Sequence, residues 1–318
     1  MKKLIKLISI IVVVIGLIVF ISFVNHKIKL KNEDALFKTN GKIVEVNGHH
    51  LNVYLSGNPN SDFTLVFMSG AGTCSPTLDF KTLYSLFEKD YQIAVVEKAG
   101  YGFSDISDIS RDIDTILFET RESLNQAGVT NHKYILFPHS MSGIEALYWA
   151  NKYPNEIKGI VGLDLSVPAA YQNTQINTFL LSAAKFGADI GLTRFLPYLV
   201  DSSSAIKDGN LTEEEKELYK VIFYRRTATT SMINEAKTIK ENAKKLEEVD
   251  TTNVPMLFFI SNGDGTGYSK EEWRSFGVGY LANKQNGEYQ FLDCSHYVHN
   301  IAYQQIYEES IKFINRLK

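Results

Sequence analysis

One stretch of the chain decides its fold: YILFPHSMSGIEAL, residues 134–147. It begins as a short apolar run rich in strand formers, breaks at Pro138-His139-Ser140, and continues with apolar residues at helical spacing. A strand, a sharp turn and a helix in this order push one side chain out above the edge of a sheet, and the helix directs its positive N-terminus at the same place. Ser140 is the side chain that this pattern exposes.

The same stretch resembles the nucleophile elbow of the α/β-hydrolase superfamily, which is often written G-H-S-M-G-G. Pro138 stands in place of the first glycine and Ser142 in place of the second. Ser142 is small enough for a tight turn, whereas proline has no backbone N–H and fits only where the strand has stopped pairing on that side. The alternative is an ordinary buried strand and helix joined by a turn that contains a serine. The rest of the chain has to distinguish the two interpretations.

The overall composition is that of a globular protein. The chain has 318 residues, of which 44% are hydrophobic, with only 7 Pro and 2 Cys, which excludes a disordered or disulfide-scaffolded chain. This length suits one large α/β domain with an insertion, or two domains. The formal net charge is −3 although the N-terminal region carries six lysines, so the rest of the chain is acidic. We find no basic stripe with interleaved aromatic residues and expect no nucleic-acid partner.

The N-terminus, residues 1–32, forms a separate element. Leu7 to Val24 carries no charge and is dominated by Ile, Val, Leu and Phe, so it is just long enough to cross a hydrocarbon core. We favour an uncleaved, single-pass anchor over a cleaved signal peptide because Ser22-Phe23-Val24 is a poor cleavage site. A buried core helix is the other alternative. The flanking lysines nearly balance, with a slight bias that favours a cytoplasmic N-terminus and an extracytoplasmic catalytic domain.

The body alternates predicted strands with helices, which favours a mostly parallel sheet with helices on both faces. Asn47-Gly48 joins two alternating segments and predicts a hairpin. The predicted strands are 42–46, 51–55, 64–68, 92–97, 134–137, 157–165, 256–260 and 289–293. About eighty residues between the strands that end near 165 and begin at 256 show helical patterns instead, which is too long for one crossover.

The resemblance implies that this insertion is a helical lid. The expected organisation is a membrane anchor at 1–32, an α/β-hydrolase core formed by 41–166 and 251–318, and a lid at 167–250. The segment from Phe179 to Val200 is strongly apolar, and we expect Phe186 and Phe195 in it to line the substrate pocket.

The resemblance also implies a catalytic triad in the chain order Ser, Asp, His. Ser140 is the expected nucleophile. Asp264 follows a buried strand and is the expected acid, with Asp164 as the alternative at the end of an earlier strand. His296 follows the last strand and is the expected base, in preference to His299. Either aspartate could instead be a turn residue that bonds its own backbone.

The oxyanion hole is the fourth expected part. Glycines after the strand at 64–68 let backbone N–H groups point at a ligand. By resemblance, the backbone N–H groups of Ala71 and Met141 are the expected donors, although Ser69 stands where the family usually has histidine. Such donors stabilise the tetrahedral intermediate of acyl transfer.

Two functional hypotheses follow. The first is a membrane-anchored serine hydrolase that cleaves an ester, a thioester or an amide in a small-molecule, acyl or peptidyl substrate through an acyl-enzyme. The second is a ligand-binding protein with little or no turnover on a hydrolase scaffold. We expect no cofactor and no metal, since His49-His50 has no further ligand cluster nearby. Cys74 and Cys294 lie on the two loops that are expected to face Ser140, so they either form a disulfide or remain two separate thiols.

Overall fold

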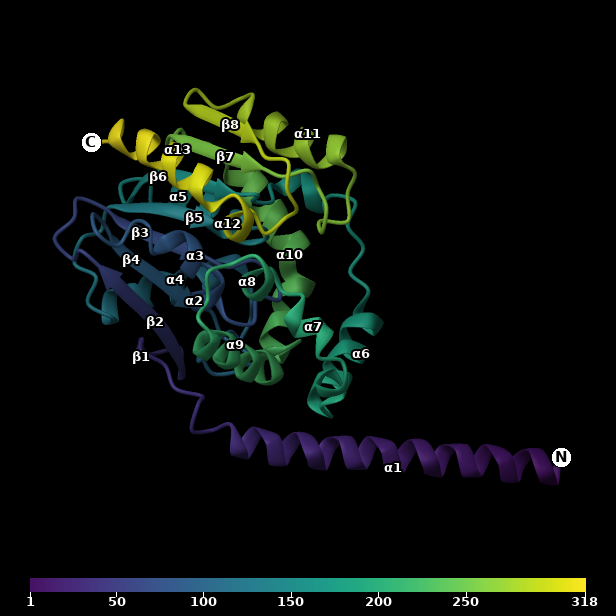
Figure 1. Cartoon of the computed structure of the whole chain (residues 1–318). Coiled ribbons are helices and arrows are strands. Elements are labelled where there is room, and N and C mark those ends of the chain that lie inside the picture. Colours follow the sequence, from purple (N-terminus) through teal and green to yellow (C-terminus); the bar gives the residue numbers. More distant parts are fainter.

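The computed structural model describes residues 1–318 and contains one eight-stranded sheet in the order β1-β2-β4-β3-β5-β6-β7-β8 (Figure 1). β2 pairs antiparallel with β1 and β4, and all other neighbouring strands are parallel. This confirms the predicted mostly parallel sheet. The strands are β1 (Lys42–Val46), β2 (His49–Gly57), β3 (Thr64–Met68), β4 (Gln92–Glu97), β5 (Tyr134–Pro138), β6 (Ile157–Leu163), β7 (Met256–Ile260) and β8 (Gly287–Phe291).

The β1–β2 hairpin confirms the predicted Asn47-Gly48 turn. Both residues have positive φ angles, 54° for Asn47 and 77° for Gly48. A two-residue type I′ turn requires this conformation at both positions, and Asn and Gly tolerate it best.

Helices cover both faces of the sheet because the central strands are apolar on both sides. In β3, Leu65 and Phe67 pack into one core cluster while Val66 and Met68 pack into the other, as the two-residue period of a strand requires. The first cluster lies under α3 (Lys81–Tyr84), α12 (Val298–Ile301) and α13 (Tyr303–Asn315). The second lies under α4 (Ile113–Gln126), α5 (Ser142–Lys152), α10 (Thr230–Val249) and α11 (Lys270–Leu281).

Between β6 and β7 the chain forms only helices. The capping box predicted at the start of α9 is present, since Thr212 and Glu215 bond each other's backbone N–H groups. The elements of this insertion are η1 (Pro168–Tyr171), α6 (Thr178–Asp189), η2 (Leu192–Phe195), α7 (Tyr198–Asp201), α8 (Ser204–Lys207), α9 (Glu213–Arg226) and α10; outside it, the short α2 (Pro76–Asp79) follows β3.

Helix α10 is attached to the core by a buried ion pair. Lys98, just after β4, pairs with Glu235 of α10, and both side chains are almost completely buried. The Tyr101 hydroxyl donates a second hydrogen bond to Glu235 over 2.7 Å. Charges taken out of water need such partners, so α10 is held to the loop after β4 as well as to the sheet.

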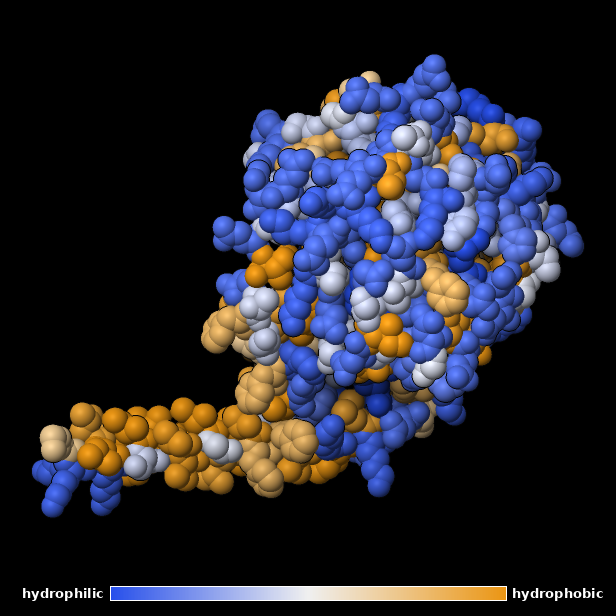
Figure 2. Space-filling model, turned by 180° about the vertical axis from the view of Figure 1, so that it is seen from behind, coloured by the Kyte–Doolittle hydropathy of each residue, from blue (hydrophilic) through white to orange (hydrophobic).

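Helix α1 (Lys2–Asn32) projects from the body, and most of its apolar surface is exposed (Figures 1 and 2). An 18-residue window has a mean hydropathy of 3.3 and is only 6% buried, so the helix is long and apolar enough to cross a membrane. Its C-terminal end contacts the insertion. The Ser22 hydroxyl donates to the Ile190 carbonyl over 2.7 Å, and the Arg194 guanidinium donates to both carboxylate oxygens of Glu33 over 2.7 and 2.8 Å.

Candidate active site

The turn between β5 and α5 has the geometry of a nucleophile elbow. Ser140 adopts a φ angle of 54°, which is uncommon for a non-glycine residue and marks a strained turn. Pro138 ends β5, and the next backbone N–H, that of His139, donates to the Met68 carbonyl over 2.9 Å. The Ser142 hydroxyl lies 2.7 Å from the same carbonyl. Both departures from the glycine pattern therefore fit the turn, and Ser142 adds a bond to β3.

His296 lies on the loop after β8 and pairs with Asp164 at the end of β6. The distance between His296 Nδ1 and Asp164 Oδ2 is 2.6 Å, and the Asp164 side chain is completely buried. An ionised carboxylate only accepts hydrogen bonds, so this contact assigns the imidazole proton to Nδ1 and leaves Nε2 as the basic nitrogen. Asp164 Oδ1 accepts from the Ser261 backbone N–H over 2.7 Å and from the Trp273 indole over 2.8 Å. These donors satisfy the buried carboxylate and fix its orientation.

The sequence-based choice of Asp264 as the acid is wrong in this geometry. Its carboxylate is exposed and accepts from the Asn262 side chain over 3.2 Å, while its backbone N–H donates back to Asn262 over 3.0 Å. Asp264 is thus the turn aspartate of the alternative interpretation. Its backbone carbonyl still accepts from the His296 N–H over 2.9 Å, which holds the histidine loop in place. Asp164, the alternative acid, takes the position beside the imidazole.

The expected oxyanion donors lie beside Ser140. Neither the Ala71 nor the Met141 backbone N–H donates a hydrogen bond within the protein, so both are available to a ligand. Gly70 brings the loop after β3 close to the serine, since a Cβ atom there would lie 2.6 Å from Ser140 Cβ. Sequence reasoning recognised the glycine-rich loop but not this steric need for glycine at position 70.

Ser140, His296 and Ala71 line one cavity of about 510 Å³. Its walls come from the start of the insertion and from the loop after β7, and they are rich in aromatic side chains. They include Ala170, Tyr171, Thr174, Gly265, Thr266, Gly267, Tyr268, Trp273 and Tyr297. Phe186 and Phe195 are not among the lining residues and are 57% and 59% exposed. The expectation that they line the pocket is wrong, because α6 and η2 hold them outside the body.

A cluster of buried histidines lies beneath the elbow. His139 Nε2 is 3.1 Å from the His296 carbonyl oxygen, and its ring centre is 4.6 Å from that of His296 and 4.7 Å from that of His299. Burial, together with these two neighbouring imidazoles, holds the pKa of His139 well below its usual value. His299 Nε2 bonds Asp79 Oδ2 over 2.9 Å. His299, the alternative base, thus pairs with Asp79 and not with Asp164.

The two cysteines are free thiols, which contradicts the disulfide interpretation. Burial raises the pKa of the Cys74 thiol to about 12 and that of the Cys294 thiol to about 11. Both sulfurs therefore stay protonated at neutral pH, where a thiol is a poor nucleophile.

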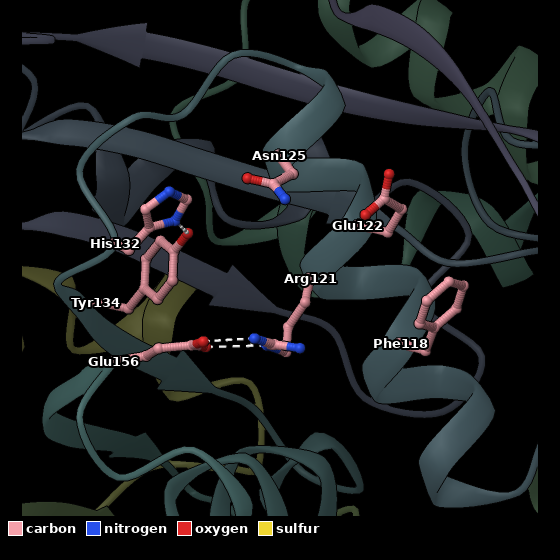
Figure 3. Close-up of a pocket in the computed structure, with 7 residues that line it drawn as sticks. All are labelled: Phe118, Arg121, Glu122, Asn125, His132, Tyr134 and Glu156. Carbon is pink, nitrogen blue, oxygen red and sulfur yellow. Dashed lines mark hydrogen bonds and ion pairs between the residues drawn. The ribbon is translucent and has the colours of Figure 1, made fainter.

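A second hollow, of about 370 Å³, lies where β5 and β6 begin (Figure 3). In Figure 3, Arg121 of α4 and Glu156 point toward each other, and Arg121 Nε donates to Glu156 Oε2 over 2.9 Å. His132 Nδ1 lies 3.1 Å from the Tyr134 hydroxyl. These polar groups bond one another at the amino ends of the strands, and Ser140 lies at the opposite, carboxyl ends. Ligands of open α/β sheets bind outside the carboxyl ends of the strands, which favours the cavity at Ser140 as the functional one.

Comparison with known proteins establishes the family. Residues 59–277 match the hydrolase family described as serine aminopeptidase, S33. The chain belongs to this family of α/β-hydrolases. The α/β-hydrolase is 35% identical to the Bacillus subtilis (strain 168) protein called uncharacterized protein YbdG over 323 residues, which cover 99% of this chain and 98% of that protein. It is 26% identical to YqjL of the same organism over 247 residues, which cover 76% and 79% of the two chains.

Solved structures confirm the fold. The haloalkane dehalogenase DbeA from Bradyrhizobium elkani USDA94 is 13% identical with a TM-score of 0.65, and the match covers 87% of this chain and 97% of DbeA. A mutant of a putative epoxide hydrolase from Pseudomonas aeruginosa is 14% identical with a TM-score of 0.66, covering 87% and 96%. At these identities the likeness shows a shared fold, and the reaction has to be argued from the site.

Proposed function

We propose that this α/β-hydrolase is a membrane-anchored serine hydrolase that cleaves an ester, thioester or amide through an acyl-enzyme. The observation that carries the proposal is the 2.6 Å contact between His296 Nδ1 and Asp164 Oδ2 in a cavity that Ser140 also lines. A serine hydroxyl becomes a useful nucleophile only when a neighbouring imidazole accepts its proton, and the imidazole needs a carboxylate to fix its tautomer.

In this mechanism Ser140 Oγ attacks the carbonyl carbon of the substrate while His296 Nε2 accepts the hydroxyl proton. Asp164 stabilises the imidazolium that forms. The N–H groups of Ala71 and Met141 donate to the oxyanion, where each such donor contributes about 2.7–4 kcal/mol. The imidazolium then protonates the leaving alcohol, thiol or amine. A water molecule, deprotonated by His296, attacks the acyl carbon and releases the acid and Ser140.

The proposal also assigns roles to the other parts of the chain. Residues 1–32 are the single-pass anchor, because α1 is apolar and exposed. The body is placed on the extracytoplasmic side, because the nearly balanced flanking lysines slightly favour a cytoplasmic N-terminus. Residues 41–166 and 251–318 form the catalytic core, and 167–250 form the lid. Ser140 argues against the haloalkane dehalogenase and epoxide hydrolase reactions, which by resemblance use an aspartate nucleophile.

The test is covalent labelling with a fluorophosphonate, which reacts with activated serines. The full-length chain in detergent should be labelled, with the adduct mapped to Ser140 by mass spectrometry. Ser140→Ala should abolish labelling, whereas Ser275→Ala, which removes an exposed serine of α11, should not. Labelling that survives in folded Ser140→Ala contradicts the assignment. A folded wild-type chain that takes no label favours the ligand-binding hypothesis instead.

A further inference from the structure

The part of the lid nearest α1 exposes a large apolar surface. We call it the lid face and define it by its exposed side chains: Phe179, Leu180, Phe186, Phe195, Leu196 and Tyr198. Phe179 is 78% exposed and Leu180 is 61% exposed. Soluble surfaces rarely gather this many large apolar side chains unless another surface covers them. Apolar residues are visible in Figure 2 on this side of the body, just above α1.

Helix α6 has the pattern of an interfacial helix. Phe179, Ala183 and Phe186 follow one another at spacings of four and three residues, which places them on one face. A polar stripe lies on another face and consists of Thr178, Ser182, Lys185 and Asp189. Of the whole helix only Ala188 is buried, so the protein itself does not use the apolar stripe as core. A helix with one apolar and one polar face that is not packed into a core is suited to lie in a membrane interface.

The contacts of α1 place the lid face beside the membrane-spanning segment. The Ser22 hydroxyl bonds the Ile190 carbonyl directly after α6, and Ser22 lies close to the end of the apolar segment. One turn further along α1, the Arg194 Nε donates to His26 Nδ1 over 2.9 Å. Arg194 also holds Glu33 at the end of α1, as described above. The lid face is therefore fixed at the level where the anchor leaves the hydrocarbon core.

We propose that the lid face rests on the phospholipid bilayer that α1 spans. This inference rests on the proposed membrane anchor. The bilayer is the occupant that fits, because the lid face is continuous with a helix apolar enough for hydrocarbon. Lys27, Lys29 and Lys31 follow the apolar segment at the same level, where long basic side chains near a helix end reach the head-group layer. The apolar side chains of α6 and η2 that enter the bilayer then add to the membrane affinity of α1. They also fix the orientation of the body relative to the membrane.

The arrangement also connects the bilayer with the cavity at Ser140. Tyr171 and Thr174 line the cavity, and α6 begins at Thr178. The segment that forms one wall of the cavity thus leads directly into the helix that rests on the bilayer.

The test uses tryptophan as a depth probe in the full-length chain. The two native tryptophans, Trp149 and Trp273, are buried and supply a constant background. Phe186→Trp and Phe195→Trp place a probe on the lid face. Phe118→Trp is the matched control. Phe118 is 50% exposed on α4, beside the hollow at the amino ends of β5 and β6. Each chain is reconstituted into vesicles of phosphatidylcholine and phosphatidylglycerol, with and without acyl-brominated phosphatidylcholine as a quencher.

The lid-face probes should lose emission with brominated lipid beyond the loss of the wild-type chain, and Phe118→Trp should not. Equal quenching of all chains overturns the proposal. A blue shift of the lid-face probes without quenching also overturns it, because the surface is then covered by protein, such as a second copy. Alkaline carbonate washing tests the membrane anchor separately from the contact between the lid face and the bilayer. A chain that the wash removes contradicts the anchor and the lid face together, whereas a retained chain without quenching contradicts the lid face alone. The reaction at Ser140 enters neither readout.

Discussion

Strand β5 and helix α6 are both rich in apolar residues, and their environments are opposite. Every residue of β5 is buried, while α6 buries only Ala188 of its twelve residues. β5 is in the middle of a sheet with helices on both sides, so its apolar side chains are covered whichever way they point. Little of the protein packs against α6, and its Phe179 side chain is exposed. Apolar composition thus predicts that a segment is removed from water, but it does not predict whether protein or lipid covers it.

The largest effect that we expect concerns Asp164, the buried carboxylate that we propose as the triad acid. Asp164→Asn should lower kcat on p-nitrophenyl esters by about 10⁴-fold, the scale seen when a triad aspartate loses its charge. Asparagine tolerates the positive φ of 51° at this position, so the fold should survive, as circular dichroism can check. Asp264→Asn is the matched control and should change kcat by less than about threefold, or about 0.7 kcal/mol in the barrier, because the exposed Asp264 carboxylate pairs with Asn262 and asparagine keeps the backbone carbonyl that accepts from the His296 N–H. The opposite ranking would restore Asp264 as the acid.

The second prediction concerns stability where helix α10 meets the core. Glu235→Ala leaves Lys98 buried without its partner and should lower the free energy of unfolding by about 3–5 kcal/mol. Glu241→Ala removes an exposed carboxylate from the same helix and should stay within about 0.5 kcal/mol of the wild type. Urea titration of the full chain in detergent measures both. Equal midpoints for the two variants would show that the buried pair does not hold α10.

The third prediction is a pH effect from the histidines beneath the elbow. Burial lowers the pKa of His139 below the usual 6.5, so below that pH the unfolded chain binds a proton at His139 that the folded chain does not. Protons then favour unfolding, and stability should fall as the pH drops from 6.5 toward the lowered pKa, by at most about 1.4 kcal/mol per pH unit.

The matched variant is His139→Asn, in which this part of the pH dependence should be missing. The comparison is made between slopes of unfolding free energy against pH rather than absolute stabilities, because asparagine also changes the packing against His296 and His299. Parallel slopes for the two chains between pH 6.5 and 5 would contradict the prediction.

The smallest effect is expected on the lid face. Phe186→Ala and Phe195→Ala should leave the ratio of kcat/KM for soluble butyrate and acetate esters within about twofold, because truncating an exposed side chain changes little. Tyr268→Ala, in the cavity wall, should change this ratio clearly. Enzyme in detergent micelles and monomeric substrates keep the bilayer out of the measurement. A large shift for Phe186→Ala would mean that α6 folds over the cavity during turnover.

The parts of the protein that sequence could predict are those with local signals. The strand, turn and helix around Ser140 lie within fourteen residues, and the Asn47-Gly48 hairpin follows from two. The choice between Asp164 and Asp264 could not be made this way. It depends on how the loop after β8 passes β7 and reaches the end of β6, which is set by the order of the strands in the sheet. Whether Phe186 faces the cavity or lies outside it likewise depends on how α6 packs on the rest of the protein, which the spacing of residues within the helix does not predict.

The bond between Glu235 and the loop after β4 has a consequence for how this protein can change over evolution. Helix α10 carries a partner for Lys98 and Tyr101, so a foreign α10 would leave a buried ammonium and a buried hydroxyl unmatched. Helix α9 is tied to the core as well, since the Arg226 Nε donates to the Gly102 carbonyl over 2.7 Å and Glu215 pairs with Lys81. In contrast, α6 and η2 make no side-chain hydrogen bond to the core, so the exchangeable module of this chain covers these two elements and ends at Pro197, before α7. Relatives can differ widely in that module without changing the residues around Ser140, and an exchange of the module between relatives should be joined at the turns that bound it.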